Sequence, residues 1–440
     1  MAFFADFLHY KPLFLPATVM LIEFSVTNFR SIAERQTLSL AASTRKELRA
    51  THVIEDPPLP LLSAAAIFGP NASGKSNLFR AIAMLQWLIQ WSAGFQPGQP
   101  LPLTPFRLTA ELAKQPSEFE IHFIADGVRY QYGFSGTQQR VVAEWLHAYP
   151  KGPARLLFER SLDSQIRPTW KMGPSFEGSA QQHKLWQEST RDNALFLSTA
   201  VQLNNAQLRP VFHWLTQRLV VLTQDLAVNP VPSFELLSDR AGAVRLMSLL
   251  KAADVGIERL ELKEDDSAPP WPVGGVRLVV QRPSTPEDPS PKPQSMRVLA
   301  WHTQSDGESI AFDFGDESNG TRKLFEHAGG LLRALDTGAT VCIDEIDTSL
   351  HPYITRFLVQ QFQRPHNRQG AQLIFSTHDT TLLDPELLRR DQFWFVEKDS
   401  RGCSSLTPLL EYSPRTGESL ERGYLKGRYG AVPLIGALEP

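Results

Sequence analysis

Alternating apolar and polar positions predict a set of antiparallel strands in the first half of the chain. Residues 119–123 and 128–134 alternate on either side of Asp126-Gly127, a pair that is typical of tight turns. This arrangement predicts a β-hairpin. Further strands of the same kind are expected at residues 21–26, 36–40, 141–149 and 155–160.

Continuous apolar runs predict a second, buried and parallel sheet. The run at residues 64–68 is short and wholly apolar, and residues 340–343 and 374–376 form short runs that are mostly apolar. Apolar residues recur at helical spacing from Asn77 to Gln90, and residues 190–260 are expected to be mostly helical. The patterns together predict an α/β fold with a mixed central sheet and an antiparallel β lobe.

A complete phosphate-loop motif, G-x-x-x-x-G-K-S, stands between the first apolar run and its helix. Gly69 and Gly74 let the backbone N–H groups curl toward phosphate oxygens, Lys75 can reach the outer phosphates, and Ser76 can bind Mg²⁺. The strand–loop–helix context favours this interpretation over a chance glycine-rich turn. The ligands predicted are ATP and Mg²⁺, and the nucleotide-binding residues are Gly69, Pro70, Asn71, Ala72, Ser73, Gly74, Lys75, Ser76 and Asn77.

Two acidic residues follow the apolar run at 340–343 and predict the second half of the site. Asp344 can join Ser76 in the Mg²⁺ shell. Glu345 is then placed to polarise the water that attacks the γ-phosphate, which is general-base work. Two surface acids at a strand end are the alternative, and the phosphate loop favours the catalytic role. Because the two halves are far apart in sequence, a sizeable lobe must be inserted between them.

His378 follows the third apolar run, within Ser376-Thr377-His378-Asp379. Ligands of open α/β sheets bind at the carboxyl ends of the strands, where a neutral imidazole could contact the γ-phosphate or the attacking water. An isolated histidine at a strand end is more often structural, and the acidic pair upstream favours function. The predicted catalytic residues are Lys75, Glu345 and His378.

The order of these motifs resembles the ABC-type ATPase heads of the SMC, RecF and OLD-like proteins. The closest resemblance is to the stand-alone ABC-type ATPases of prokaryotic anti-phage loci, the AAA-15-type proteins that include RloA. It runs from about Met20 to the end of the chain and is weak between residues 150 and 290. It also covers Asn28-Phe29-Arg30-Ser31, Glu317-Ser318-Asn319-Gly320-Thr321, Asp347 and the segment 424–433.

The resemblance implies a P-loop NTPase fold, an ABC-type head with an inserted, mostly helical lobe. Arg30 would lie near the nucleotide phosphates, and Asp347 would belong to the D-loop. ATP on the phosphate loop of one subunit would be capped by the signature residues of another, so the resemblance implies a homo-oligomer, at least a dimer. These signature residues are Ser318, Asn319 and Gly320.

The chain departs from the family pattern in several places. Its signature loop is Ser-Asn-Gly-Thr rather than Ser-Gly-Gly, although small residues at a helix N-terminus can still bind a phosphate. Gln115 is a weak candidate for the Q-loop glutamine. Neither a long coiled coil nor an acid-rich nuclease motif after His378 is evident. The habit of the family and the lack of a catalytic domain together imply a separately encoded effector, such as a nuclease.

The function that the resemblance favours is a sensor or scaffold ATPase in anti-phage defence. The main alternative is a RecF- or SMC-like ATPase of DNA repair or chromosome maintenance that clamps duplex DNA, which would need a basic face. The net charge of −3 argues mildly against a DNA-clamping ATPase but does not exclude DNA as a partner. A small-molecule kinase and a binding protein that no longer hydrolyses ATP are disfavoured by the acidic pair and His378.

Length and composition predict two lobes and a reducing, cytoplasmic environment. The chain has 440 residues, too many for one ordinary core, and two cysteines, too few for a disulfide framework. Residues 1–19 are too interrupted for a signal peptide or a membrane span and are read as an extension. The expected parts are an N-terminal ATPase part at 20–150, an inserted lobe at 151–300 with a proline-rich linker at 283–295, and a C-terminal ATPase part at 301–440.

Overall fold

The computed structural model of the chain describes residues 19–55, 59–223, 230–253, 256–264, 277–281, 293–414 and 417–433. These residues form two compact units. The larger unit comprises those within Pro16–Leu226, Ala334–Asp347 and Leu358–Pro440, and the smaller one those within Ala227–Arg333 and Thr348–Phe357. The expected extension, apart from Val19, and residues 283–292 of the expected linker lie outside the described residues.

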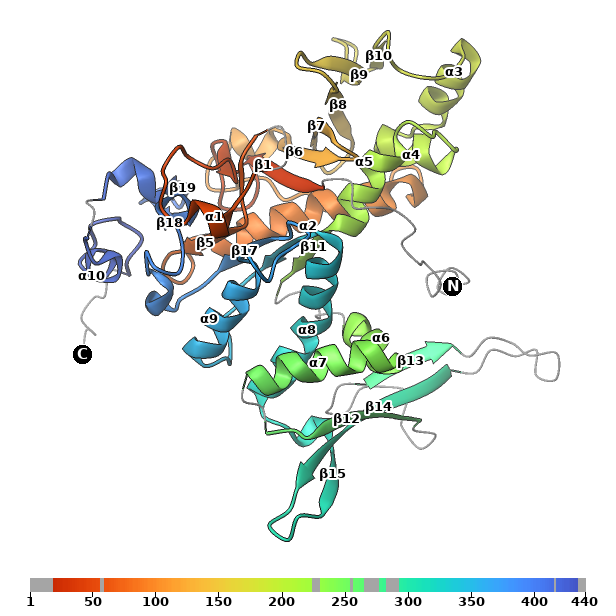
Figure 1. Cartoon of the computed structure of the whole chain (residues 1–440). Helices are drawn as coiled ribbons and strands as arrows, with labels where there is room; N and C mark the ends of the chain where they lie inside the picture. Colours follow the sequence, from red (N-terminus) through yellow and green to blue (C-terminus); the bar gives the residue numbers. More distant parts are fainter. Residues whose placement is uncertain are drawn as a thin grey trace, which may run out of the picture. The chain divides into compact units, whose positions relative to one another are not determined.

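A six-stranded sheet forms the centre of the larger unit (Figure 1). Its order is β11-β16-β17-β5-β18-β19, and all strands are parallel except β19, which runs antiparallel to β18. The three runs predicted as buried parallel strands are β5, β16 and β17, and every residue in them is buried, which confirms the prediction. The strands are β5 (Ala64–Phe68), β11 (Leu219–Leu222), β16 (Thr340–Ile343), β17 (Gln372–Ser376), β18 (Phe393–Lys398) and β19 (Ser404–Pro408).

A seven-stranded antiparallel sheet in the order β10-β9-β8-β7-β6-β1-β2 is the predicted β lobe. Ala125 pairs with Val128 across the turn, where Asp126 and Gly127 have φ angles of +49° and +74°. Two successive left-handed residues match the twist of the flanking strands, so the predicted hairpin is confirmed. The strands are β1 (Met20–Thr27), β2 (Gln36–Ser39), β6 (Ser117–Ala125), β7 (Val128–Gly136), β8 (Val141–Tyr149), β9 (Arg155–Leu162) and β10 (Pro168–Met172).

Helix α2 (Lys75–Trp91) lies along the parallel sheet (Figure 1). Its Leu78 and Leu85 belong to the same buried cluster as Ile67 of β5 and Phe119 of β6, so one apolar core joins both sheets. The other helices and short strands wholly within this unit are α1 (Arg49–His52), β3 (Val53–Ile54), β4 (Leu61–Leu62), α3 (Ala180–Ser189), α4 (Phe196–Gln202), α5 (Arg209–His213), a π-helical turn (Trp214–Arg218) and α10 (Leu420–Leu425).

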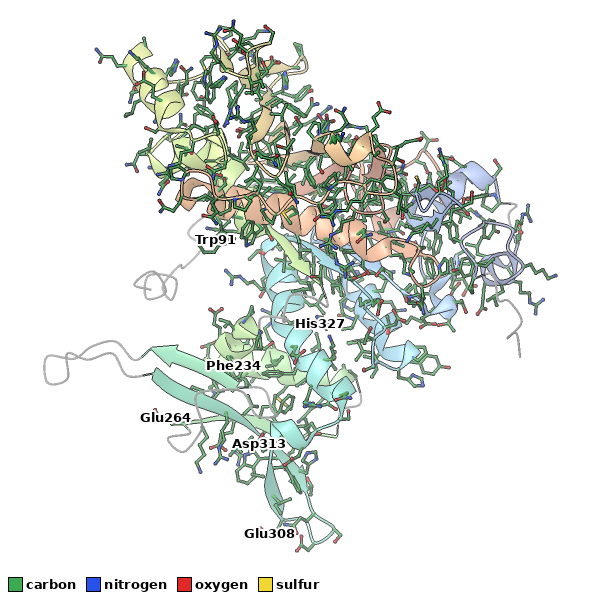
Figure 2. The ribbon with its side chains drawn as sticks, turned by 180° about the vertical axis from the view of Figure 1, so that it is seen from behind. Trp91, Phe234, Glu264, Glu308, Asp313 and His327 are labelled. Carbon is green, nitrogen blue, oxygen red and sulfur yellow. The ribbon has the colours of Figure 1, made fainter. Side chains whose placement is uncertain are left out.

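The smaller unit contains a second antiparallel sheet and helices packed beside it. Strand β14 pairs with β12, β13 and β15. Ser233 Oγ donates to the carbonyl oxygen of Phe325 at 2.5 Å and accepts from Gly329 N at 3.0 Å, which fixes the start of α6 against α8. Figure 2 labels Phe234 on α6 and His327 on α8. The elements are α6 (Val231–Ser238), α7 (Arg240–Ala252), β12 (Arg259–Glu264), β13 (Arg277–Gln281), β14 (Pro293–Thr303), β15 (Ser309–Asp313) and the first part of α8 (Asn319–Thr337).

The region expected to be mostly helical, residues 190–260, contains helices α4 to α7. It also contains β11, which joins the parallel sheet of the larger unit, and the start of β12. The chain passes between the units within α8 and α9 (Pro352–Gln361). Among the described helices, none is both long and apolar enough to cross a bilayer.

Candidate nucleotide-binding site

The predicted phosphate loop follows β5 and leads directly into α2, whose first residue is Lys75. Gly74 has a φ of +112°, a conformation that side chains strongly disfavour. A Cβ atom at Gly74 would also collide with Ser404 Oγ, and one at Gly69 with the carbonyl oxygen of Val396. Both glycines are therefore required by the backbone path, as the motif predicts.

Lys75 is buried at the centre of this loop, with 4% of its surface exposed. Its Nζ donates to the carbonyl oxygens of Gly69 at 2.7 Å and Pro70 at 3.1 Å. Burial lowers the pKa of Lys75, and the nearby carboxylates of Glu345 and Asp344 oppose that shift without cancelling it. The lysine thus carries a charge that its surroundings do not fully compensate.

Hydroxyl groups from segments distant in the sequence form hydrogen bonds with the phosphate loop and with Asn77. Ser404 Oγ, on β19, donates to the carbonyl oxygen of Ser73 at 2.6 Å, and it lies 2.8 Å from Ser31 Oγ. Asn77 Nδ2 donates to the same Ser31 hydroxyl at 2.7 Å. The sequence interpretation gave Ser31 and Ser404 no role, because no local pattern relates residues so far apart to the loop.

Asp344 and Glu345 follow β16 and are held by one hydroxyl group. Ser376 Oγ donates to Asp344 Oδ1 at 2.7 Å and accepts from the backbone N–H of Glu345 at 2.7 Å. Glu345 has a φ of +55°, which is strained for a residue with a side chain. Asp344 is buried, whereas the carboxylate of Glu345 remains partly exposed. Ser376, at the end of β17, is a supporting residue that the sequence interpretation quoted without a function.

His378 follows β17, the strand that lies between β5 and β16. Its Nε2 is 4.0 Å from Glu345 Oε1, and its backbone N–H donates to Asp347 Oδ2 at 3.3 Å. Burial and then the charge of Lys75 lower the pKa of His378, while Asp347 and Glu345 raise it. A histidine with a lowered pKa is neutral at pH 7, so one ring nitrogen can accept a hydrogen bond while the other donates.

The residues present fit a magnesium-bound triphosphate. Ser73 Oγ is buried and has no hydrogen-bond partner among the described residues, which leaves a donor in the loop that a phosphate oxygen could use. Across the same described ranges, no three His, Cys, Asp or Glu side chains gather in a way that could hold a metal ion.

The predicted signature residues lie in the smaller unit, at the start of α8. Ser318 Oγ accepts from Thr321 N at 3.1 Å, and both Ser318 and Asn319 are exposed. A Cβ atom at Gly320 would lie 2.5 Å from the carbonyl oxygen of Ser349, so the signature loop packs closely against the residues that follow Asp347. Glycine is therefore required at this position.

Arg30 and Gln115, which the sequence analysis also named, take no part in the hydrogen bonds described above for the phosphate loop, the acidic pair and His378. Arg30 is exposed, has a φ of +52°, and stacks its guanidinium 5.7 Å from the ring centre of Phe29. Gln115 accepts a hydrogen bond from Asn28 Nδ2 through its backbone oxygen at 3.0 Å. Their roles toward a nucleotide stay predictions.

Comparison with known proteins identifies a family. The family described as "AAA domain, putative AbiEii toxin, Type IV TA system" matches residues 64–384, a span that begins with β5 and ends beyond His378. Among curated proteins, none matches the chain significantly.

Solved structures of SMC heads are similar at low identity. The SMC head domain from Thermotoga maritima has 13% identity and a TM-score of 0.38, over 88% of this chain and 98% of that one. A Pyrococcus furiosus Smc head with an extended coiled coil, bound to the C-terminal domain of ScpA, has 11% identity and a TM-score of 0.36, over 93% and 98%. Because these scores are low, the family assignment depends on the sequence match, which covers most of the chain and both halves of the site. The protein therefore belongs to the family of AAA-domain P-loop ATPases that this description defines.

Proposed function

We propose that the protein is a magnesium-dependent ATPase that acts as a sensor or scaffold in anti-phage defence. The observation that carries the ATPase proposal is the convergence of three strand ends. Lys75 follows β5 by way of the phosphate loop, Glu345 follows β16, and His378 follows β17 between them. Each residue has the chemistry that its place in such a site requires.

Each side chain then has a defined task. Lys75 and the loop N–H groups bind the outer phosphates, and Ser76 with Asp344 holds Mg²⁺. Bound Mg²⁺ supplies charge neutralisation of the phosphate oxygens. Glu345 accepts a proton from the attacking water through its partly exposed carboxylate, and His378 orients the water or the γ-phosphate. The Ser376 hydroxyl bonds the Asp344 carboxylate and the Glu345 backbone N–H. It thus holds Asp344 for Mg²⁺ binding while the Glu345 carboxylate stays available to the water.

We further propose that two copies of the chain close around ATP. Ser318, Asn319 and Gly320 of one copy would cap the nucleotide on the phosphate loop of the other. Two observations support this: the exposure of Ser318 and Asn319, and their position at the N-terminus of the long helix α8, whose partial positive charge favours a phosphate. ATP would then favour the dimer by binding it better than the open state.

The defence role is supported by the family description, which names a toxin of a toxin–antitoxin system. The described residues after His378 form β18, β19 and α10 and contribute two strands to the central sheet. We propose that a separate protein, such as a nuclease, carries the effector activity, as the resemblance to the ATPases of anti-phage loci implies. Binding of DNA by the dimer is an alternative output, with affinity that would fall steeply with salt.

The test compares the parent protein with Glu345→Gln. The parent should release phosphate from ATP in the presence of Mg²⁺. The variant should bind ATP and lose turnover by about a hundredfold or more, since general-base catalysis contributes that much. It should also accumulate as an ATP-dependent dimer in size-exclusion chromatography with light scattering. Turnover at the parent rate would show that Glu345 is not the base.

A further inference from the structure

We propose that the C-terminal segment Ser419–Ala431 positions the loop that carries His378, through a hydrogen bond between Thr380 and Glu421. The inference rests on the proposed function, because it takes His378 as part of the nucleotide site. Residues 424–431 of this segment belong to the stretch 424–433 that the resemblance covers, and the ATPase mechanism assigns the segment no task. Glu421 is a positioning residue in this proposal, since it acts through the loop.

The loop after His378 is a single short turn, Thr380–Leu382, held from two sides. On one side, Asp379 Oδ1 accepts from the backbone N–H of Thr381 at 3.0 Å and from its hydroxyl at 2.6 Å. On the other side, Thr380 Oγ1 donates to Glu421 Oε1 at 2.8 Å. Thr380 is two residues from His378, so the carboxylate of Glu421 restrains the backbone that places the imidazole.

The segment that supplies Glu421 is itself firmly anchored. Tyr424 stacks on Phe395 of β18 at 5.6 Å between ring centres and contacts Phe68 edge-on at 6.1 Å. Tyr429 stacks on Phe395 at 5.4 Å. Phe68 is the last residue of β5 and immediately precedes Gly69. One segment therefore contacts both the strand that leads into the phosphate loop and the turn that follows His378.

Hydrogen bonds and a close contact also hold the end of the segment. Tyr424 Oη donates to the carbonyl oxygen of Ala431 at 2.8 Å, and Ala431 N donates to Glu397 Oε2 at 3.3 Å. Gly430 has a φ of +61°, and a Cβ atom there would collide with Glu397 Oε2. These contacts anchor the segment that carries Glu421, the acceptor for Thr380. Catalytic geometry is sensitive to displacements of about 1 Å, so this support should appear in turnover.

The experiment measures both the mobility of the turn and catalysis. Hydrogen–deuterium exchange of the nucleotide-free protein reports on the amides of Thr381 and Leu382, which are hydrogen-bonded within the turn. Steady-state ATP hydrolysis reports kcat and KM. The variants are Glu421→Ala, Glu421→Gln, which keeps a carbonyl acceptor, and Thr380→Val, which removes the donor. Glu411→Ala, at an exposed acid elsewhere in the C-terminal region, is the matched control.

We expect Glu421→Ala and Thr380→Val to raise exchange in the turn by about tenfold, because local opening becomes easier. Both should lower kcat by about fivefold or more with KM within about twofold of the parent, and the double variant should be no worse than either single one. Glu421→Gln and Glu411→Ala should behave as the parent does.

Unchanged exchange in Glu421→Ala would overturn the inference, and so would raised exchange with an unaltered kcat. An equal loss in Glu411→Ala would show a general effect of removing a charge and would also contradict it. A parent protein that neither binds nor hydrolyses ATP would contradict the proposed function instead, and exchange would still decide whether Glu421 holds the turn.

Discussion

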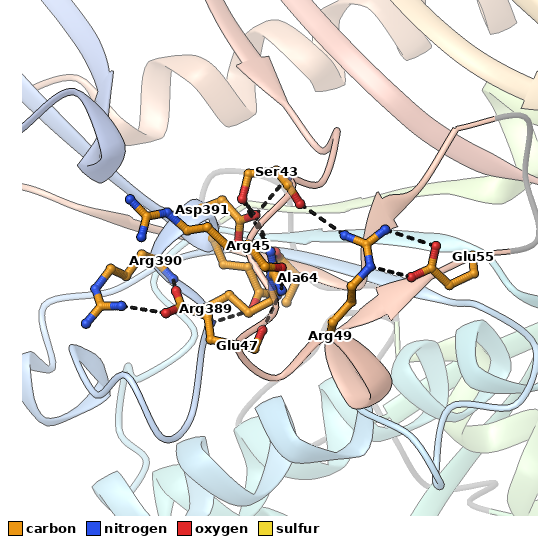
Figure 3. Close-up of polar contacts among 10 residues, drawn as sticks. Ser43, Arg45, Glu47, Arg49, Glu55, Ala64, Arg389, Arg390 and Asp391 are labelled. Atoms are coloured by element: carbon orange, nitrogen blue, oxygen red, sulfur yellow. Dashed lines mark hydrogen bonds and ion pairs between the residues drawn. The ribbon is translucent and has the colours of Figure 1, made fainter. Parts of the chain in front are cut away.

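Two buried cations in the larger unit, Arg389 and Lys75, are accommodated in opposite ways. The guanidinium of Arg389 is completely buried and forms a two-pronged pair with Asp391, with Nε–Oδ1 and Nη2–Oδ2 distances of 2.8 and 2.7 Å (Figure 3). Its Nη1 donates to the carbonyl oxygens of Arg45 and Glu47. Every nitrogen of this side chain has a partner within the fold.

Lys75 donates to two carbonyl oxygens of its own loop, and the carboxylates of Asp344, Glu345 and Asp347 act on it as nearby charges. The difference between the two sites separates a structural charge from one that we propose to be functional. The Arg389 cluster joins the loop at Ser43 to the start of β18 and has no capacity left for a ligand. The carboxylates around Lys75 do not fully balance the cost of burying its positive charge. The negative charge of a bound triphosphate would complete that balance.

The sharpest way to break this comparison is Arg389→Met. Removing one partner of a buried ion pair leaves the other charge uncompensated, so the free energy of unfolding should fall by about 3–5 kcal/mol. Chemical denaturation measures this loss. ATP turnover per folded molecule should not change, because Arg389 touches none of the site residues described above.

The control for that variant is an exposed pair with the same spacing. Arg401 Nε lies 2.9 Å from Asp399 Oδ2 at the surface, so Arg401→Met should leave the melting temperature unchanged. If Arg389→Met were as stable as Arg401→Met, burial would not distinguish the two pairs. The double variant Arg389→Met/Asp391→Leu should lose less than the two single changes combined.

The second prediction concerns Lys75→Met. Loss of the counter-charge should weaken ATP binding by about a hundredfold or more, which corresponds to about 2.7 kcal/mol. The melting temperature should stay the same or rise. The pKa of Lys75 is below its ordinary value, so its charged form costs folding free energy at neutral pH, and the cost is relieved only as pH rises through the lowered pKa. Calorimetric titration and thermal unfolding measure the two effects.

Unaltered nucleotide affinity in Lys75→Met would contradict the assignment of the phosphate loop. A clear loss of stability would instead place Lys75 in the same structural class as Arg389.

The smallest expected effect is the pH dependence of the Arg389 cluster. Burial alone would raise the pKa of Asp391, but hydrogen bonds from Arg389 and Ser43 outweigh it and lower the pKa below its ordinary value. The stabilisation is therefore complete above the unfolded pKa, about 3.9, and is lost as pH falls through the lowered folded pKa. The difference in unfolding free energy between the parent and Asp391→Asn should be constant near neutral pH and narrow below about pH 4. A difference that widened in acid would reverse the assigned sign.

Much of the fold could be predicted from the sequence because its signals are local. The Asp126-Gly127 turn, the buried runs at β5, β16 and β17, and the phosphate loop each depend on neighbouring residues. Strand β11 was missed within a region expected to be mostly helical, since its four residues, Leu219–Leu222, are too few to show a clear period. Its pairing with β16 is a contact within the folded sheet, and the composition of its four residues does not predict that contact.

The sequence by itself determined that Lys75, Glu345 and His378 follow strands whose apolar character is visible in the chain, and the roles proposed for them start from that position. Only the tertiary structure decided that β17 lies between β5 and β16, which brings His378 to within 4.0 Å of Glu345. It also decided the supporting contacts of Ser404 and Glu421, which join segments hundreds or tens of residues apart. The backbone geometry of a helix or a strand sets the spacing of its apolar residues, so that pattern can be read locally. Which strands become neighbours, and which distant side chains form hydrogen bonds, depends on how the whole core packs.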